Sequence, residues 1–195
     1  QLTKKISRSI GLLRKLHPFV TSKILTNVYY AIVYPFILYG IVIWGSNGKT
    51  ILEPIHKLQK SFVRLVALGN SYPITHGPLP HSPPLFQKLK LLTVFDIYKL
   101  QLGKLVYDSI NNIGPNNSII RFTRVEDVHE HYTRYATRGS LFNNCARTTR
   151  FGLKSLLNQG TNYWTSLSPH IKNSQTSNIF KFRLKKELLQ AYSEQ

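Results

Sequence analysis

Acidic residues are the side chains that metal-dependent polymerases and nucleases use, and this sequence contains only eight of them. Two-metal catalysis places several carboxylates around ions that lie about 4 Å apart. Asp96 and Asp108 fall on one predicted helix, where each has a structural role, and no Asp-Asp pair follows an aromatic residue. The sequence also lacks a glycine-rich phosphate loop and a Gly-x-Ser-x-Gly motif. We therefore expect no catalytic residues in this chain and no enzymatic activity of its own.

Two further groups of residues have the right chemistry for a site but lack the right spacing. His129-Glu130-His131 follows Glu126-Asp127, which suggests a metal cluster, yet adjacent residues point in different directions on a regular element. Cys145 is the only cysteine, so the sequence excludes a disulfide framework and a zinc site with two thiolates. A nucleophilic cysteine needs a positioned histidine and an electropositive pocket. We expect a solvated polar turn at 126–131, a half-buried thiol at Cys145, and no metal or cofactor.

Basic residues dominate the charged side chains. The chain has 26 Lys and Arg against 8 Asp and Glu, which gives a net charge of +18. Residues 1–52 contain no acidic residue, and neither do residues 131–186. At 42% hydrophobic and 12% aromatic residues, the chain is not a disordered basic tail. Such a surplus favours a polyanionic partner, with nucleic acid first and an anionic membrane surface second.

The densest group of guanidinium side chains lies in the second half of the chain. Arg134 and Arg138 each follow a threonine, Arg147 and Arg150 come soon after, and aromatic residues lie among them: Tyr132, Tyr135, Phe142 and Phe151. Arginine forks match phosphate geometry and aromatic rings stack on bases, so this composition is typical of single-stranded nucleic-acid contacts. Surface charge without a partner is the alternative interpretation.

Helices are expected to position the basic residues of the first half. Residues 24–44 carry no charge and are long enough to span a bilayer. Pro35 lies in the middle of this segment, which favours instead a buried helix that follows a cap at Thr21 and bends or breaks at the proline. Residues 2–16 are predicted to form a basic amphipathic helix, suited to a phosphate backbone or a membrane surface. Its apolar residues recur at helical spacing: Leu2, Ile6, Ile10, Leu13 and Leu16.

Further helices are expected after residue 49. Thr50 and Glu53 have the spacing of a capping box, with Pro54 in the first turn. The apolar stripe of the helix that they begin comprises Ile55, Leu58, Phe62, Leu65 and Val66. A proline-rich connector over 70–84 leads to a short helix over 85–92. Thr93 and Asp96 then cap a longer helix, which ends before Gly114-Pro115 and has the apolar face Val94, Ile97, Leu100 or Gln101, Leu105 and Ile110.

The second half has weaker periodicity and more Thr, Arg, Asn and Gly. Residues 145–157 could hold short strands in a hairpin, 159–167 a short helix, and a basic helix capped by Ser174 or Ser177 closes the chain. The predicted fold is mainly α, with a helical bundle in the first half and mixed helix with a small β-hairpin in the second. It divides into a helical region (1–69), a connector (70–84), a helical hairpin (85–114) and a basic extension (115–195).

Three sets of residues can be read together in chain order. They are Tyr29-Tyr30 with Pro35, Tyr39-Gly40 and Trp44; Leu58-Gln59-Lys60 with Arg64; and His131 and Thr133-Arg134 followed by Gly160, Trp164, Leu167 and Phe180-Lys181. This ordered set covers nearly the whole chain and resembles the C-terminal part of reverse transcriptases from non-LTR retrotransposons (LINE-type, Jockey- or CR1-like). Thr165 and Ser168 depart from the family pattern, which usually has Asn and Pro there.

The resemblance implies a helical, thumb-like region in residues 1 to about 70, followed by a C-terminal extension. The family's palm, with its paired aspartates and Mg²⁺, would lie upstream of Gln1. The chain would then be a fragment of an RNA-directed DNA polymerase, and we expect Gln1 not to be a natural start because the chain contains no Met. The implied partners are an RNA template, a DNA primer and the palm and fingers of the same polyprotein, in the nucleus or cytoplasm.

A thumb grips phosphates without reading sequence, so the resemblance directs attention to basic residues on rigid helices. The predicted backbone contacts are Lys4, Lys5, Arg8, Lys60, Arg64, Arg134 and Arg138. Two other functions stay open at this point. One is a membrane-associated protein with a span at 24–44, and the other is a domesticated stand-alone RNA-binding protein.

Overall fold

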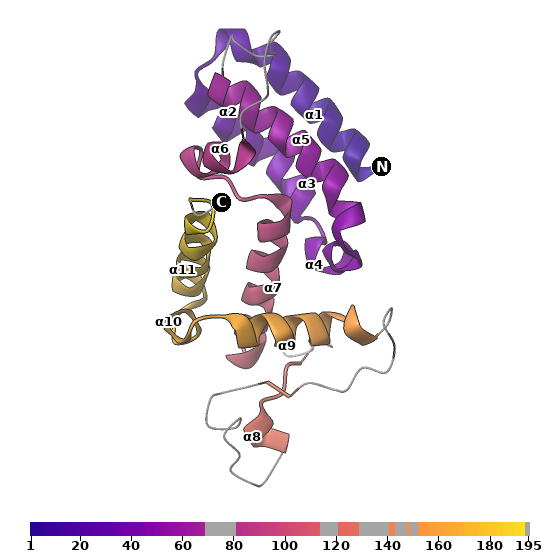
Figure 1. The fold of residues 1–195 in the computed structure, drawn as a ribbon, viewed down its shortest axis with the longest axis vertical. Helices are drawn as coiled ribbons and strands as arrows, with labels where there is room; N and C mark the ends of the chain where they lie inside the picture. Colours follow the sequence, from indigo (N-terminus) through magenta and orange to yellow (C-terminus); the bar gives the residue numbers. More distant parts are fainter. Residues whose placement is uncertain (69–80, 114–120, 129–140, 143–147, 149–151, 194–195) are drawn as a thin grey trace. The chain divides into compact units, whose positions relative to one another are not determined.

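The computed structural model describes residues 1–68, 81–113, 121–128, 141–142, 148 and 152–193. Within these residues the chain is built from helices, and the only β pairing is an isolated bridge between Arg124 and Leu141 (Figure 1). This confirms the prediction of a mainly α fold. The hairpin predicted over 145–157 falls partly outside the described residues, and its last residues begin a helix instead of a strand.

The chain divides into two compact units. Unit 1 comprises residues 1–97 and 186–195, and unit 2 comprises residues 98–185. Two helices contribute residues to both units: α7 (Val94–Ile110) and α11 (Ser177–Gln190). The two units do not coincide with the four regions predicted from the sequence (1–69, 70–84, 85–114 and 115–195). That division into four regions stays a prediction.

Unit 1 is a helical assembly in which α1 packs along α5, and α5 also contacts α2 and α6 (Figure 1). Besides the parts of α7 and α11, its elements are α1 (Leu2–Leu16), the 3₁₀ turn η1 (His17–Phe19), α2 (Ser22–Val28), the π-helical turn η2 (Tyr29–Val33), α3 (Tyr34–Leu38), α4 (Ile41–Trp44), the 3₁₀ turn η3 (Gly45–Asn47), α5 (Lys49–Leu68) and α6 (Ser82–Lys88).

Helix α1 has the bounds that its apolar spacing predicts. Ile6, Ile10 and Leu13 are at most 2% exposed, so the apolar face of the helix lies in the core of unit 1. Burying three such side chains contributes several kcal/mol, at about 1.5–3 kcal/mol each. The helix ends where Pro18 enters η1, as the sequence predicts.

Residues 22–44 form four helical pieces, so the predicted helix is interrupted and not only bent. The π-helical turn η2 ends at Val33, two residues before Pro35, and the Tyr34 N–H donates to the Tyr29 carbonyl five residues back. A wider turn there accommodates a proline that clashes with the preceding turn of a regular α-helix. A second break follows at Gly40, whose φ of +63° favours glycine.

The uncharged segment is buried along one side only. Its buried residues recur every four positions: Leu25, Tyr29, Val33, Ile37 and Ile41. Tyr39 and Ile43, in contrast, are 84% and 77% exposed. Among the described residues, no helix combines the length and the apolar character that crossing a bilayer would require.

Helix α5 begins two residues earlier than a cap at Thr50 would place it, and the predicted capping box is wrong. Because the helix starts at Lys49, Thr50 lies inside the first turn, where the Ile51 N–H donates to the Gly48 carbonyl. Pro54 consequently lies inside the helix, past its first turn. Four residues of the predicted stripe are buried, whereas Leu58 is only half-buried: the buried ones are Ile55, Phe62, Leu65 and Val66.

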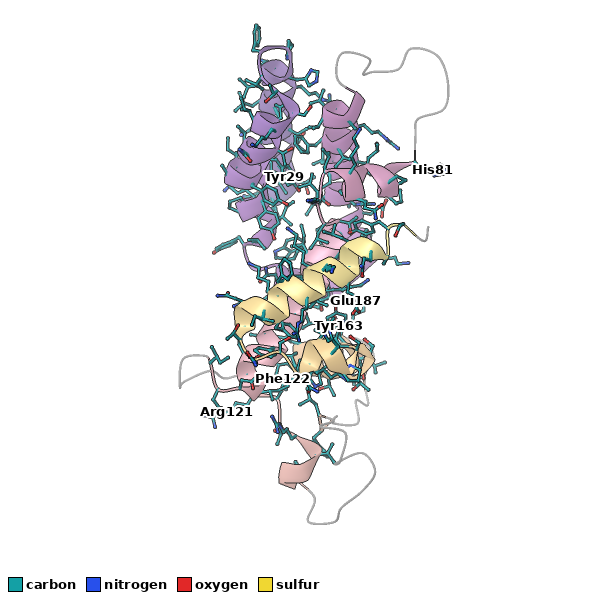
Figure 2. All side chains as sticks on the ribbon, turned by 90° about the vertical axis from the view of Figure 1, so that its left-hand side faces the viewer. Tyr29, His81, Arg121, Phe122, Tyr163 and Glu187 are labelled. Atoms are coloured by element: carbon teal, nitrogen blue, oxygen red, sulfur yellow. The ribbon has the colours of Figure 1, made fainter. Side chains whose placement is uncertain are left out.

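Gln59 joins three parts of unit 1 from a position that is 0% exposed. Its amide nitrogen donates to the Tyr29 hydroxyl at 2.8 Å and to the Leu92 carbonyl at 3.3 Å. Its carbonyl oxygen accepts from the Val94 N–H at 2.7 Å, at the first residue of α7. The ring of Tyr29 also stacks on Phe62 at 4.6 Å, in the interior of the unit (Figure 2). Gln59 therefore connects α5, η2 and the start of α7.

The start of α7 has the predicted cap, with an added participant. The Thr93 hydroxyl accepts from the Asp96 N–H at 3.3 Å and donates to the Asp96 carboxylate at 2.6 Å. The Tyr192 hydroxyl accepts from the Thr93 N–H at 3.0 Å and donates to the same carboxylate. Burial, and then the charge of Asp96, raises the pKa of Tyr192. A residue near the C-terminal end thus completes a cap at Thr93.

Helix α6 starts at Ser82, so the expected helix over 85–92 is displaced toward the N-terminus. Pro83 and Pro84 occupy its first turn, where a missing backbone donor has little cost. The apolar face of α7 also differs from the expected one beyond its second turn. Leu105 and Ile110 are half-buried, and the core positions are taken by Leu102, Val106 and Tyr107.

Unit 2 packs around aromatic rings from its helices, which include α8 (Val125–Val128), α9 (Leu156–Ser166) and α10 (Pro169–Lys172) as well as parts of α7 and α11. Phe180 of α11 stacks on Tyr107 at 4.5 Å and on Trp164 at 6.0 Å. Gly160 of α9 allows close approach of Phe122, because an added Cβ would lie 2.6 Å from that ring. Figure 2 labels Phe122. The predicted helix around Trp164 is confirmed.

The cap of α11 is Thr176, not Ser174 or Ser177. The Thr176 hydroxyl accepts from the Ile179 N–H at 3.3 Å, and its carbonyl accepts from the Phe180 N–H at 2.9 Å. Ser177 is already the first helical residue, and the Ser174 hydroxyl donates to the Ile171 carbonyl. Three candidate hydroxyls within four residues explain why the sequence alone does not single out the cap.

Candidate nucleic-acid interface

The solvent face of α1 carries three cations in one row. Lys4, Arg8 and Lys15 are exposed and follow each other at helical spacing, opposite the buried face of the helix. Gly11 lies between them, and among the described residues no atom outside its own stretch of helix comes within 4 Å of the place where its Cβ would be. We call Lys4, Arg8 and Lys15 the basic stripe. At 1.5 Å per residue, the stripe extends over about 16 Å.

Two other cations of α1 have partners inside unit 1. The Lys5 ammonium group lies 5.9 Å from the centre of the Phe36 ring, a cation–π distance. The Arg14 guanidinium donates to the Ser61 hydroxyl of α5 at 2.5 Å, so it connects the two helices. Lys5, one of the predicted contacts, is therefore beside the stripe, whereas Lys15 is on it.

Helix α5 presents a second group of cations away from its buried face. Lys57 is exposed, and the predicted contacts Lys60 and Arg64 are half-buried. His56 packs against the rings of Phe86 and Phe95 at 5.9 and 5.1 Å. Burial, and then the charge of Lys60, lowers the pKa of His56, which favours a neutral imidazole. The predicted contact set omits Lys15 and Lys57. Helical spacing places each of them on the face of its helix opposite the apolar residues, and this is the sequence signal that could have identified both.

Charge is divided evenly between the two units. By sequence each unit has 13 basic and 4 acidic residues, which gives +9 for each. In unit 1 the cations are least opposed in residues 1–52, which have no carboxylate at all and include the whole of α1. A row of exposed cations in a segment without acids favours a positive potential, which attracts polyanions at a distance.

Several predicted residues cannot be placed. Arg134 and Arg138 lie outside the described residues, and so do Arg147 and Arg150 of the same cluster. The residues proposed for a metal cluster at 129–131 and Cys145 also lie outside them. Within the part of the chain that the structure describes, no three His, Cys, Asp or Glu side chains are grouped as metal ligands.

Two of the carboxylates have structural partners, as the sequence predicts. Asp96 belongs to the cap of α7, where it accepts from Thr93 and Tyr192. Asp108 accepts a hydrogen bond from the Lys104 ammonium group at 2.9 Å, one helical turn away. Each carboxylate thus stabilises a helix of its own unit.

Several of the residues that carry the resemblance to reverse transcriptases have structural contacts within their own unit. Tyr29 and Gln59 form the buried hydrogen bond in unit 1, and Trp164 stacks on Phe180 in unit 2. Trp44 lies against Gly40, and its indole N–H donates to the Tyr39 carbonyl at 2.7 Å. These contacts fix the positions of helices within each unit.

Comparison with known proteins does not identify a family for this chain. No family model, no curated protein and no solved structure matches the chain.

Proposed function

We propose that this chain is a nucleic-acid-binding fragment that grips phosphate backbones without reading sequence and has no catalytic site of its own. The observation that carries the proposal is the basic stripe: three exposed cations on one rigid helix, in a segment that has no acid. Backbone contacts of this kind fix the position of a nucleic acid without specifying its sequence. Such binding depends steeply on salt, because each neutralised phosphate releases counterions.

The resemblance to LINE-type reverse transcriptases supports a more specific form of the same proposal. In it, unit 1 contains the helical thumb of an RNA-directed DNA polymerase, and the partners are the RNA template and the DNA primer. The Mg²⁺-dependent chemistry would belong to the palm of the parent protein. The packing of α1 on α5 supports this role, because a gripping surface needs helices that hold their cations in place.

The test is a salt titration of oligonucleotide binding. The variant Lys4→Gln/Arg8→Gln/Lys15→Gln removes three cations from the stripe. The slope of log K against log salt should fall by about 2.7 on duplex DNA, because each cation contributes about 0.9. Neutral glutamine keeps the helix propensity, so folding should not change.

A matched variant controls for the loss of three charges. Lys49, Lys88 and Lys90 are exposed cations of unit 1 that lie outside α1, and their replacement by Gln changes the net charge by the same amount. This control should retain most of the slope. Binding that does not respond to salt, an absence of binding, or equal losses in both variants would contradict the proposal.

A further inference from the structure

Phe19 is an aromatic side chain that the fold leaves in solvent. It is the last residue of η1, which follows α1, and it is 83% exposed. Exposed apolar residues that occur singly are normal, so exposure alone carries no function. The charges around this ring are what distinguish it.

Cations flank Phe19 on both sides along the chain. Lys15 lies four residues before it and Lys23 four residues after it, and both are exposed. The nearest acidic residue in sequence is Glu53. Tyr39 of the same unit is equally exposed, at 84%, yet residues 24–48 contain no Lys or Arg. Along the chain, the exposed ring of Phe19 therefore has a cation four residues away on each side, whereas Tyr39 has none within nine residues.

The ring also lies at the end of the basic stripe. Lys15 is the last stripe residue, His17 still has helical backbone angles, and Phe19 follows one turn later. A backbone whose phosphates follow the stripe toward the C-terminal end of α1 therefore reaches this ring next. Aromatic rings beside tracked phosphates are the usual composition of single-strand sites, because every base has a face on which to stack.

We propose that Phe19 is a stacking platform for an unpaired base, so that the stripe and η1 together bind single-stranded nucleic acid or a single-stranded end. This inference rests on the proposed function and adds to it a preference for unpaired bases. In an intact duplex each base already stacks on its neighbours, so the ring gains no such contact there.

An anionic membrane is the other partner that combines lysines with an exposed aromatic ring. A helix that lies on a membrane inserts its apolar face among the lipids. On α1 that face is Ile6, Ile10 and Leu13, which are at most 2% exposed and packed inside unit 1. The free face of α1 carries the stripe instead, which fits phosphates in solution better than acyl chains.

The experiment compares the full chain with Phe19→Ala and Tyr39→Ala. Each protein is titrated against a labelled DNA single strand of about 12 nucleotides and against the matching blunt duplex, at about 0.1 M salt. Phe19→Ala should weaken single-strand binding about 5- to 150-fold, which corresponds to the loss of one stacked base. Duplex binding should stay within about twofold, Phe19→Trp should restore the single-strand affinity, and Tyr39→Ala should change neither.

The outcomes separate this inference from the function on which it rests. If the unaltered chain binds neither oligonucleotide, the proposed function fails and the inference fails with it. If the unaltered chain binds but Phe19→Ala has no effect, or weakens duplex and single strand equally, the stacking platform alone is overturned. If Phe19→Ala weakens binding to phosphatidylserine vesicles but leaves oligonucleotide binding unchanged, the ring contacts a membrane instead. That result would also overturn the stacking platform. Because the ring is exposed, circular dichroism of Phe19→Ala should show the same fold as the unaltered chain. If the fold of Phe19→Ala is changed, Phe19→Leu replaces it in the titrations.

Discussion

Replacing Gln59 by Leu should destabilise unit 1 strongly. Gln59 is one of the residues that carry the resemblance to an enzyme family, but its contacts in the structure are structural. Leucine has a similar size, so the change removes the hydrogen bonds and leaves little empty space. The side chain is 0% exposed and makes contacts at 2.7, 2.8 and 3.3 Å with Val94, Tyr29 and Leu92. Water cannot replace an interior partner easily, so the groups left behind carry the cost.

The magnitude follows from the groups that lose a partner. The Val94 N–H is at the first residue of α7, where no carbonyl of the same helix can accept from it. An unsatisfied buried donor costs about 1–3 kcal/mol, and each lost neutral hydrogen bond costs about 1 kcal/mol more. We therefore expect Gln59→Leu to lower the free energy of unfolding by about 2–5 kcal/mol.

Urea unfolding followed by tryptophan fluorescence measures this loss in the correct unit. The chain has two tryptophans, Trp44 in unit 1 and Trp164 in unit 2. In a Trp164→Phe background, Trp44 alone reports the unfolding of unit 1. Gln190→Leu is the matched control, because this glutamine belongs to the same unit but is exposed, and its effect should stay within about 0.5 kcal/mol.

A double-mutant cycle identifies the bond itself. Tyr29→Phe removes the hydroxyl that accepts from Gln59 and should cost about 1 kcal/mol alone. Combined with Gln59→Leu, the loss should be smaller than the sum of the two, because the shared bond is removed only once. A loss below about 1 kcal/mol for Gln59→Leu, or strict additivity with Tyr29→Phe, would refute the reasoning.

Three further predictions concern the stability of the two units. Gly11→Ala should stabilise unit 1 by about 0.5–1 kcal/mol in urea unfolding, because the position is exposed, helical and open around the missing Cβ; a destabilised variant would contradict this. Gly160→Ala should destabilise unit 2 by about 1–3 kcal/mol, measured by Trp164 fluorescence, because the new methyl group would lie 2.6 Å from Phe122; an unchanged midpoint would show that the ring moves aside freely. Unit 1 should lose stability above about pH 10, because burial raises the pKa of Tyr34 from 10.0 to about 12, so the unfolded chain releases a proton that the folded chain keeps. Tyr34→Phe should reduce this loss by at most about 1.4 kcal/mol per pH unit, and equal pH profiles for both proteins would exclude Tyr34 as its source.

Local patterns predict those element boundaries that neighbouring residues in the sequence determine. The bounds of α1 follow from its apolar period, and the Thr93 cap of α7 follows from residues three apart. Tyr192 adds a bond to that cap from 99 positions along the chain, which no local pattern contains. Pro54 shows that a local preference can also be overridden. Proline prefers the first turn of a helix, yet Pro54 lies inside α5, where the packing of the helix outweighs that preference.

The candidate site is predicted only in part, for a related reason. Counting charges identifies α1 as basic, but it does not say which cations remain free after the helices pack. Lys5 and Lys15 look equivalent in sequence, yet one lies over Phe36 and the other lies on the stripe. That distinction depends on which faces α3 and α5 cover, and the neighbours of a helix are set by the whole unit.

The residues that carry the resemblance and those that carry the basic stripe are two different sets. Tyr29, Gln59 and Trp164 lie in the interior, whereas the stripe residues belong to none of the motif strings. Interior motifs constrain how helices pack, and one packing arrangement can serve many functions. A salt slope that falls in the stripe variant would therefore assign backbone binding to this chain itself. An unchanged slope would leave the resemblance as a statement about fold alone.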